Sequence, residues 1–562
     1  PPLLRPGPLM RRLWPLATLA LLQACSNCGG APTEAPSRYL AKTAEMAVEI
    51  PDLAALATRK AAIVAKLEGV ATKEQVDLAV LELKRTLTFD PTTVEGLEAA
   101  GLPKKGAVAV EVIDSGRGAL WVVPVGNKEK LQATLDELVK SRMRAEETKE
   151  EAVEGGKVKV HYGTFGPEKV VVGAHAFVSG FVLVGVGPKA LDSVKGALAR
   201  KKEDSLLLHP EYAPLVASLG EPMVRALVPS GKETAAKLAA AMDLPTDGLA
   251  ASVTSVGWAL ALDDKALAVN LSMRFDEAGK KTIATILAPK GEAPAGVRAV
   301  YSPDAVFTLA ATGDVDALIK TLAPPGSPTA AELDTAFARL KEELGVDMRE
   351  QLAALTGHLA VAVGLADIKM IANIRELMMN PARAMWSTAS TGMKAGADKA
   401  MLFGSAADPQ LAARGLQRTT RKVGERDVAV LAMTTPMEGQ DPVLMEMWSS
   451  GAAWSVSNAA ARTAVMIADE AKPHKDPLDG KPGLALTVQV LPVTKALRTL
   501  DIEALAGGGA EAMLVKGFLT KALTILDRLE RLEVRGEPTT DGLGATARLV
   551  FATGAAPAGA AK

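Results

Sequence analysis

A long internal duplication constrains the fold of this chain more than any other feature of its sequence. Seven short segments of the first half recur in the second half in the same order, at separations of 251 to 281 residues. The matched segments are 50–52 with 302–304, 89–91 with 346–347, 106–110 with 357–361, 119–122 with 400–403, 176–179 with 453–456, 228–229 with 491–492, and 273–275 with 549–551. Each match is short, but their common order predicts two homologous halves.

The duplication sets the expected domain boundaries. Residues 39–288 form the first half and residues 297–553 the second, joined by a Pro- and Gly-rich linker at residues 289–296. Each half is long enough to bury its own core. The separation between matches increases within the second half, which predicts an insertion at about residues 365–395. Residues 554–562 are almost entirely Ala, Gly and Pro, and we expect a disordered tail there.

Strands within each half follow one another on short turns. Residues 108–113 and 120–125 are apolar segments on either side of a turn of small and polar residues, and residues 258–262 and 267–275 flank a similar turn. Strands joined by short turns pair in antiparallel fashion. Asn127 is placed to cap a helix that is apolar on one face. The predicted fold class is therefore α+β, with each half a mostly antiparallel, curved sheet with packed helices.

The N-terminal segment is typical of exported lipoproteins. Met10 is followed by two arginines and by an apolar run too short to span a bilayer, so we interpret residues 10–24 as a signal peptide and residues 1–9 as an over-called start. The run ends in Leu-Gln-Ala-Cys, which resembles the lipobox of bacterial lipoproteins and implies that Cys25 carries the lipid. The alternative is a soluble secreted protein cut just before Cys25. Residues 25–38 are small, polar and rich in Pro and Gly, as expected for a tether.

Composition favours a membrane partner over nucleic acid. The chain has 64 basic and 65 acidic side chains, so it offers no cationic excess for a phosphate backbone. Its two cysteines, Cys25 and Cys28, both lie at the start of the tether, which suits an oxidising compartment. With Ser26 after the lipidated cysteine, the lipoprotein resemblance implies an outer-membrane protein that faces the periplasm or the cell surface. The expected partners are the membrane, through the acyl chains, and a lipid or an envelope protein.

Known catalytic, metal and cofactor motifs give no candidate site. The five histidines are scattered without the spacing of a zinc site: they are His161, His175, His209, His358 and His474. The sequence has neither a serine-nucleophile elbow nor a phosphate-binding loop. Residues 185–190 imitate a dinucleotide fingerprint, but Pro188 removes an amide that a pyrophosphate would need, so a structural turn is expected. We predict no catalytic residue, no metal and no cofactor.

The insertion is the segment whose composition departs most from an ordinary surface. Apolar side chains recur there at helical spacing beside basic ones, and they are Met370, Ile371, Ile374, Leu377, Met378, Met385 and Trp386. Such a stripe can cover a core. It can equally form an adaptable contact for an apolar ligand, a lipid or a partner. These seven residues are the candidate binding residues.

Several segments resemble one uncharacterised family. Residues 89–91, 101–102, 106–110 and 120–138, with their echo at 346–361, are similar to large bacterial envelope lipoproteins known as a domain of unknown function. The resemblance implies no catalytic residue. We therefore expect a non-catalytic, lipid-anchored envelope protein that acts as a binding or scaffolding module. Two alternatives stay open: a carrier or chaperone for a lipid or hydrophobic segment in the periplasm, and an envelope hydrolase that uses carboxylates.

Overall fold

The computed structural model of the chain divides into two compact units. It describes residues 34–552 apart from 54, 56–72, 166, 233–235, 237–248, 264, 289–291, 324, 345–346, 366–384, 395–396, 398–407, 436–442, 499–516, 518–519, 521 and 524–525. Unit 1 comprises the described residues before residue 239 together with Ala251–Phe275, and unit 2 comprises those of Ala239–Ala250 and those from Asp276 onward. Residues 276–288, expected in the first half, thus belong to unit 2.

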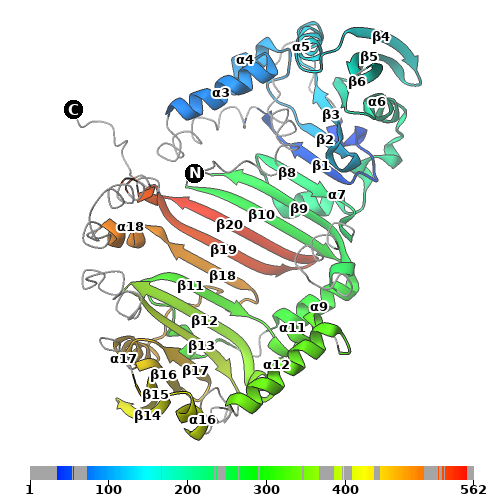
Figure 1. The fold of residues 1–562 in the computed structure, drawn as a ribbon. Helices are drawn as coiled ribbons and strands as arrows, with labels where there is room; N and C mark the ends of the chain where they lie inside the picture. The colour runs from blue at the N-terminus through cyan, green and yellow to red at the C-terminus, as the bar shows by residue number, and fades with distance from the viewer. Residues whose placement is uncertain are drawn as a thin grey trace, which may run out of the picture. The chain divides into compact units, whose positions relative to one another are not determined.

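Unit 1 is an antiparallel sheet with packed helices (Figure 1). Its strands are β1 (Met46–Ile50), β2 (Val108–Ile113), β3 (Gly118–Pro124), β4 (Glu147–Val153), β5 (Gly156–Phe165), β6 (Glu168–Val178), β7 (Phe181–Val186), β8 (Val224–Val228), β9 (Val253–Leu262) and β10 (Ala266–Phe275). Its helices include η1 (Pro36–Tyr39), α3 (Lys73–Leu87), α4 (Val94–Ala99), α5 (Lys128–Ser141), α6 (Ala190–Ala199) and α7 (Tyr212–Leu219), with short 3₁₀ turns η2 (Asp114–Gly116), η3 (Lys202–Asp204) and η4 (Leu206–Leu208). The strand order is β10-β9-β8-β1-β2-β3-β7-β6-β5-β4.

Unit 2 has the same kind of sheet. Its strands are β11 (Ala305–Thr312), β12 (Leu355–Leu365), β13 (Met385–Met393), β14 (Leu416–Val423), β15 (Arg426–Met433), β16 (Val443–Ser449), β17 (Ala453–Ser457), β18 (Leu484–Gln489), β19 (Leu529–Thr539) and β20 (Gly542–Phe551). Its helices include α9 (Glu277–Leu287), α10 (Ala295–Arg298), α11 (Val315–Leu322), α12 (Pro328–Leu344), α13 (Met348–Ala354), α16 (Asp408–Ala413), α17 (Ala460–Asp469) and α18 (Val490–Arg498). The strand order is β20-β19-β18-β11-β12-β13-β17-β16-β15-β14.

The two units share one strand order. Counted from its own first strand, each sheet reads tenth, ninth, eighth, first, second, third, seventh, sixth, fifth and fourth. Every pairing within each sheet is antiparallel. Two unrelated sheets have no reason to share this order, so the chain is a structural duplication. The α+β class and the two similar halves expected from the sequence are confirmed.

The strand registers correct two of the sequence matches. The match of residues 106–110 to 357–361 makes β3 correspond to β13. Residues 119–122 of β3 are therefore not the counterpart of residues 400–403, which lie outside the described residues. Likewise β17 corresponds to β7 and not to residues 176–179, which lie in and just after β6. Neighbouring apolar strands resemble one another in sequence, so short matches can pair a strand with the wrong neighbour.

A third match is also displaced. Asp52 follows β1, and its counterpart after β11 is Asp314, not Asp304. Both side chains accept a hydrogen bond from the backbone amide three residues on, at 3.4 Å from Ala55 and 3.1 Å from Ala317. The repeated feature is therefore an aspartate that follows the first strand and accepts from the backbone amide three residues on.

Helix α5 begins where the sequence pattern predicts. The Oδ1 atom of Asn127 accepts a hydrogen bond of 2.9 Å from the backbone amide of Lys130. The buried residues of the helix are Leu131, Leu135, Leu138 and Val139, the apolar face expected from the sequence. The cap thus fixes where the helix begins, and the apolar spacing fixes which of its residues face the sheet.

Replacement of Asn127 by alanine is expected to lower the free energy of unfolding by about 1 kcal/mol, because an amide in the first helical turn loses its acceptor. Urea unfolding of the variant measures this loss. Asn127→Ser is the control, since a serine hydroxyl can accept the same hydrogen bond. Equal losses in both variants would contradict a capping role.

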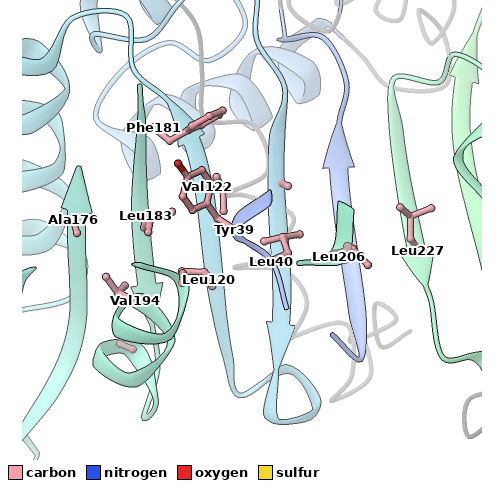
Figure 2. Packing of buried hydrophobic residues seen from close by; sticks show 14 of the residues in the cluster. Tyr39, Leu40, Leu120, Val122, Ala176, Phe181, Leu183, Val194, Leu206 and Leu227 are labelled. Atoms are coloured by element: carbon pink, nitrogen blue, oxygen red, sulfur yellow. The ribbon is translucent and has the colours of Figure 1, made fainter. Parts of the chain in front are cut away.

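The larger core of unit 1 lies on the sheet face that α6 covers (Figure 2). Leu120 and Val122 of β3, Leu183 of β7 and Val194 of α6 are each at most 1% exposed. A second core on the opposite face packs α4 and α5 against the same strands. The sheet is therefore buried on both faces over its central strands, which accounts for their nearly continuous apolar sequence.

Candidate functional site

The strand pair β9–β10 carries an exposed apolar patch, which we call the unit 1 open face. It consists of Trp258 and Leu260 on β9 and Val269 and Leu271 on β10, with exposed fractions of 39%, 36%, 46% and 38%. The register places Trp258 opposite Leu271 and Leu260 opposite Val269. Residues directly opposed on one face are close neighbours, so the four side chains form one contiguous apolar surface.

The other face of these strands is buried. Ala259 lies between Trp258 and Leu260, is 1% exposed, and packs in the core that includes Leu215 and Leu219 of α7. Because successive strand residues point to opposite faces, β9 packs one side under α7 and presents the other outward. Strands that are apolar on both faces are typical of sheets with something packed on each side.

Unit 2 repeats this arrangement on β18, β19 and β20. Its apolar side chains, which we call the unit 2 open face, are the exposed Leu484 and the half-buried Leu486, Val488, Leu532, Val534, Leu543 and Leu549. The register of the repeat makes Leu532 and Leu549 equivalent to Val256 and Met273, on the same face as Leu260 and Val269. The opposite face of β19 is charged, with Arg531 Nε and Glu533 Oε1 2.6 Å apart. The apolar character is thus confined to one side of the strand.

Two of the seven predicted binding residues fall in described structure, and the helix expected for them is wrong. Met385 and Trp386 begin strand β13, the counterpart of β3, so the insertion does not extend through residues 385–393. Met385 is 45% exposed, whereas Trp386 is 9% exposed on the opposite face. The two neighbours therefore cannot share one contact surface. Met370, Ile371, Ile374, Leu377 and Met378 lie outside the described residues, as does Cys25.

A groove between α11 and α12 is a second apolar concavity of unit 2. Its volume is about 420 Å³, and its lining residues are Ile319, Ala323, Thr329, Glu332, Leu333 and Ala336. It is a separate feature from the open face, because helices rather than strands line it. One carboxylate at its margin distinguishes it from the open faces, which are wholly apolar.

Two of the scattered histidines meet inside unit 1. His161 of β5 and His175 of β6 are 1% and 2% exposed, and His161 Nε2 lies 2.9 Å from His175 Nδ1. The outer ring nitrogens also have partners, with Thr148 Oγ1 2.9 Å from His161 and Gln132 Oε1 3.3 Å from His175. The side chains of four elements thus form one hydrogen-bonded row, in which the two imidazoles are buried.

Every ring nitrogen in this row has a partner when both rings are neutral. The Gln132 carbonyl can only accept, so His175 donates from Nε2 and accepts at Nδ1 from His161, which in turn accepts from the Thr148 hydroxyl. Burial lowers the pKa of His175 to about 3, assisted by His161, and burial also lowers the pKa of His161. Sequence reasoning missed this pair because a 14-residue separation matches no metal-ligand spacing.

Metal and membrane-spanning features are not evident in the described part of the chain. Its residues include no group of three or more His, Cys, Asp or Glu side chains that could hold a metal ion. None of its helices combines the length and the apolar character needed to cross a bilayer.

Comparisons with known proteins add little. No family model and no curated protein matches the sequence. Solved structures with partial similarity include crystal forms I and III of TP0453, from Treponema, both 12% identical to this chain. Form I matches 44% of this chain and 81% of its own with a TM-score of 0.24, and form III matches 45% and 86% with a TM-score of 0.25. At these values the likeness carries no argument about fold or function.

Proposed function

We propose that this chain is a non-catalytic, lipid-anchored binding protein of the cell envelope whose open faces hold the acyl chains of a lipid. The observation that carries the proposal is the contiguous apolar patch on β9–β10, with an apolar face on the equivalent strands of unit 2. Large apolar patches on the surface of a protein mark binding sites. These two lie on paired strands, so their shape is already set before a ligand arrives.

The chemistry of the open faces favours a ligand that makes no hydrogen bonds. The backbone groups of β9 are taken by β8 and β10 on its two sides. An extended polypeptide laid across this surface would bury its own amides without partners, which costs free energy. An acyl chain has no such groups, and each methylene that leaves water contributes about 0.8 kcal/mol. An acyl chain therefore suits the surface better than a peptide strand.

The expected location supports the same ligand. The lipobox resemblance at Cys25 leads us to propose anchoring in the outer membrane, with the two units on the periplasmic or outer side. An anchored protein meets lipid at high effective concentration, because its tether restricts it to the membrane surface. Binding to the open faces then requires only modest intrinsic affinity.

The variant Leu260→Glu, combined with Leu532→Glu on the open face of unit 2, tests the proposal. We expect the wild-type chain, purified from the envelope of its own host, to carry a lipid mass in native mass spectrometry. The double variant should lose at least tenfold in lipid occupancy, because a carboxylate on an apolar contact surface must be desolvated on binding. Organic extraction of both samples identifies the lipid.

The matched control is Ala213→Glu, which adds the same charge at an exposed position of α7, on the opposite side of β9. Its lipid occupancy should equal that of the wild type. A wild-type chain free of lipid would overturn the proposal. A copurified amphipathic helix in place of lipid would also overturn it and favour the scaffolding role.

A further inference from the structure

The interior layer of unit 2 under α10 and α17 differs in chemistry from its counterpart in unit 1. In unit 1 the layer under α6 is apolar, and Val122 of β3 lies opposite Leu183 of β7. The equivalent pair in unit 2 is Ser390 and Ser455, whose hydroxyls hydrogen-bond at 2.8 Å. The same fold therefore surrounds an apolar layer in one repeat and a polar layer in the other.

The layer contains a buried charged residue with donors that are unpaired within the described residues. Arg462 of α17 is equivalent to Ala190 of α6, lies at 7% exposure, and stacks its guanidinium 4.4 Å from the centre of the Trp386 ring. Its Nε and Nη2 atoms have no hydrogen-bond partner in the described structure. Those two atoms form one edge of the guanidinium plane, the edge that pairs with a planar anion through two parallel hydrogen bonds.

Neighbouring polar groups are also unsatisfied. Thr388 follows Trp386 on the same strand face, and its buried hydroxyl has no partner among the residues that the structure covers. The same holds, within those residues, for Nε of Arg298 on α10, a helix that packs on β13, β17 and α17. Buried donors without acceptors cost free energy, so the layer is one in which an added acceptor would be stabilised.

Two described carboxylates of unit 2 act on Arg462 without pairing directly with it. Asp304 and Asp469 attract the guanidinium without a hydrogen bond to it, and Asp469 contacts His474 at 3.2 Å. Burial lowers the pKa of Arg462 despite these two carboxylates. Two other buried acids of the layer are already paired, Glu446 with Arg421 at 2.7 Å and Glu470 with Arg426 at 2.6 Å.

We propose that this layer binds a small oxyanion, a carboxylate or a phosphate, on the Nε–Nη2 edge of Arg462. Trp386 holds the guanidinium plane through a cation–π contact, so that edge faces a fixed direction. The Thr388 hydroxyl supplies a further donor. The site lies on the opposite side of β13 from Met385 and the open face, so it is independent of the acyl-chain proposal.

Thermal unfolding of the full-length chain tests this site with defined anions. The protein is titrated with sodium acetate or sodium phosphate, with sodium chloride keeping the ionic strength constant. Mass action predicts that Tm rises with the logarithm of the bound anion's concentration, by about 5 °C or more at 100 times its Kd. A rise with acetate alone identifies a carboxylate site, and a rise with phosphate alone identifies a phosphate site. No rise with either anion would overturn the proposal.

Two variants separate recognition from packing. Arg462→Met keeps the apolar stem against Trp386 and removes the charge, so it should be at least as stable as the wild type in chloride and should not respond to the anion. Arg462→Lys keeps a charge but not the two-donor edge, and should lose at least tenfold in affinity. An unchanged anion response in Arg462→Met would place the binding elsewhere and refute the assignment.

Discussion

Replacement of Arg225 by alanine is expected to destabilise unit 1 by about 3–5 kcal/mol. Glu49 of β1 is 3% exposed, and its Oε2 accepts from Arg225 Nε at 2.8 Å and lies 2.7 Å from Arg225 Nη2. The Tyr212 hydroxyl donates to the other carboxylate oxygen at 2.8 Å. Without Arg225 the carboxylate stays buried with one neutral donor, and the lost pairing cannot be replaced by water at 3% exposure.

The second repeat supplies the control for this variant. The strand registers make Ala310 and Ala485 the counterparts of Glu49 and Arg225, so the fold tolerates two small side chains at this pair of positions. The double variant Glu49→Ala/Arg225→Ala should therefore regain at least half of the stability lost in Arg225→Ala. Hydrogen exchange of β1 and β8 peptides reports on unit 1 alone. A double variant no more stable than the single one would show that lost packing, rather than an unpaired charge, dominates.

Local sequence patterns were sufficient for much of the fold. The turns after residues 113 and 262 predicted antiparallel hairpins, and both are present as β2–β3 and β9–β10. Asn127 and the apolar spacing after it placed α5. These features depend on neighbours within a few residues, which the sequence displays directly. The duplication was also detectable, because homologous strands keep their order even where individual matches are displaced.

The histidine pair shows why the interior chemistry was not predictable. Near the turn, β5 and β6 pair Phe165 with Glu168 and Tyr162 with Val171, a register that would put His161 and His175 on opposite faces. An irregularity between His161 and Tyr162 shifts the pairing by one residue and brings both imidazoles to the same face. No turn residue or periodicity in the sequence marks that shift.

The polar layer around Arg462 was missed for a different reason. Its members come from α10, β13 and α17, separated by many residues along the chain. The sequence placed Trp386 in a helix of the insertion, whereas β13 puts it under Arg462. Only the strand registers show that Arg462 occupies the position of Ala190 in the other repeat. The comparison shows that a charged side chain replaces a small apolar one at this position.

Acidification is expected to destabilise unit 1 through the histidine pair. In the folded chain the pKa of His175 is about 3, whereas an unfolded histidine titrates near 6.5. The unfolded state therefore binds more protons below pH 6.5, so stability is complete above that pH and falls progressively toward pH 3. At pH 5 the loss from His175 alone is about 2 kcal/mol, at 1.36 kcal/mol per pH unit below 6.5.

Burial is the main reason why the fold disfavours the proton. Both nitrogens of a charged imidazole donate, so a proton on His175 requires His161 to accept at Nε2 and to donate from Nδ1 to the Thr148 hydroxyl. Lys159 opposes a second positive charge, and Asp136 favours it without contacting either ring. Protonation of either ring therefore places a charge in a desolvated strand pair, and protonation of both rings leaves two N–H groups facing each other.

The variant His161→Leu/His175→Met isolates this effect from the titration of surface carboxylates. It copies unit 2, where Leu431 and Met447 occupy the equivalent positions at 2% and 4% exposure. Hydrogen exchange of β5 and β6 peptides in each protein, at pH 7.5 and at pH 5, gives the local free energy of opening once intrinsic exchange rates are corrected for pH. The wild type should lose about 2 kcal/mol more than the variant between the two values. Equal losses would mean that the two histidines take up protons in the folded chain as readily as in the unfolded chain, as they would in a row open to water, and this result would contradict a buried neutral pair.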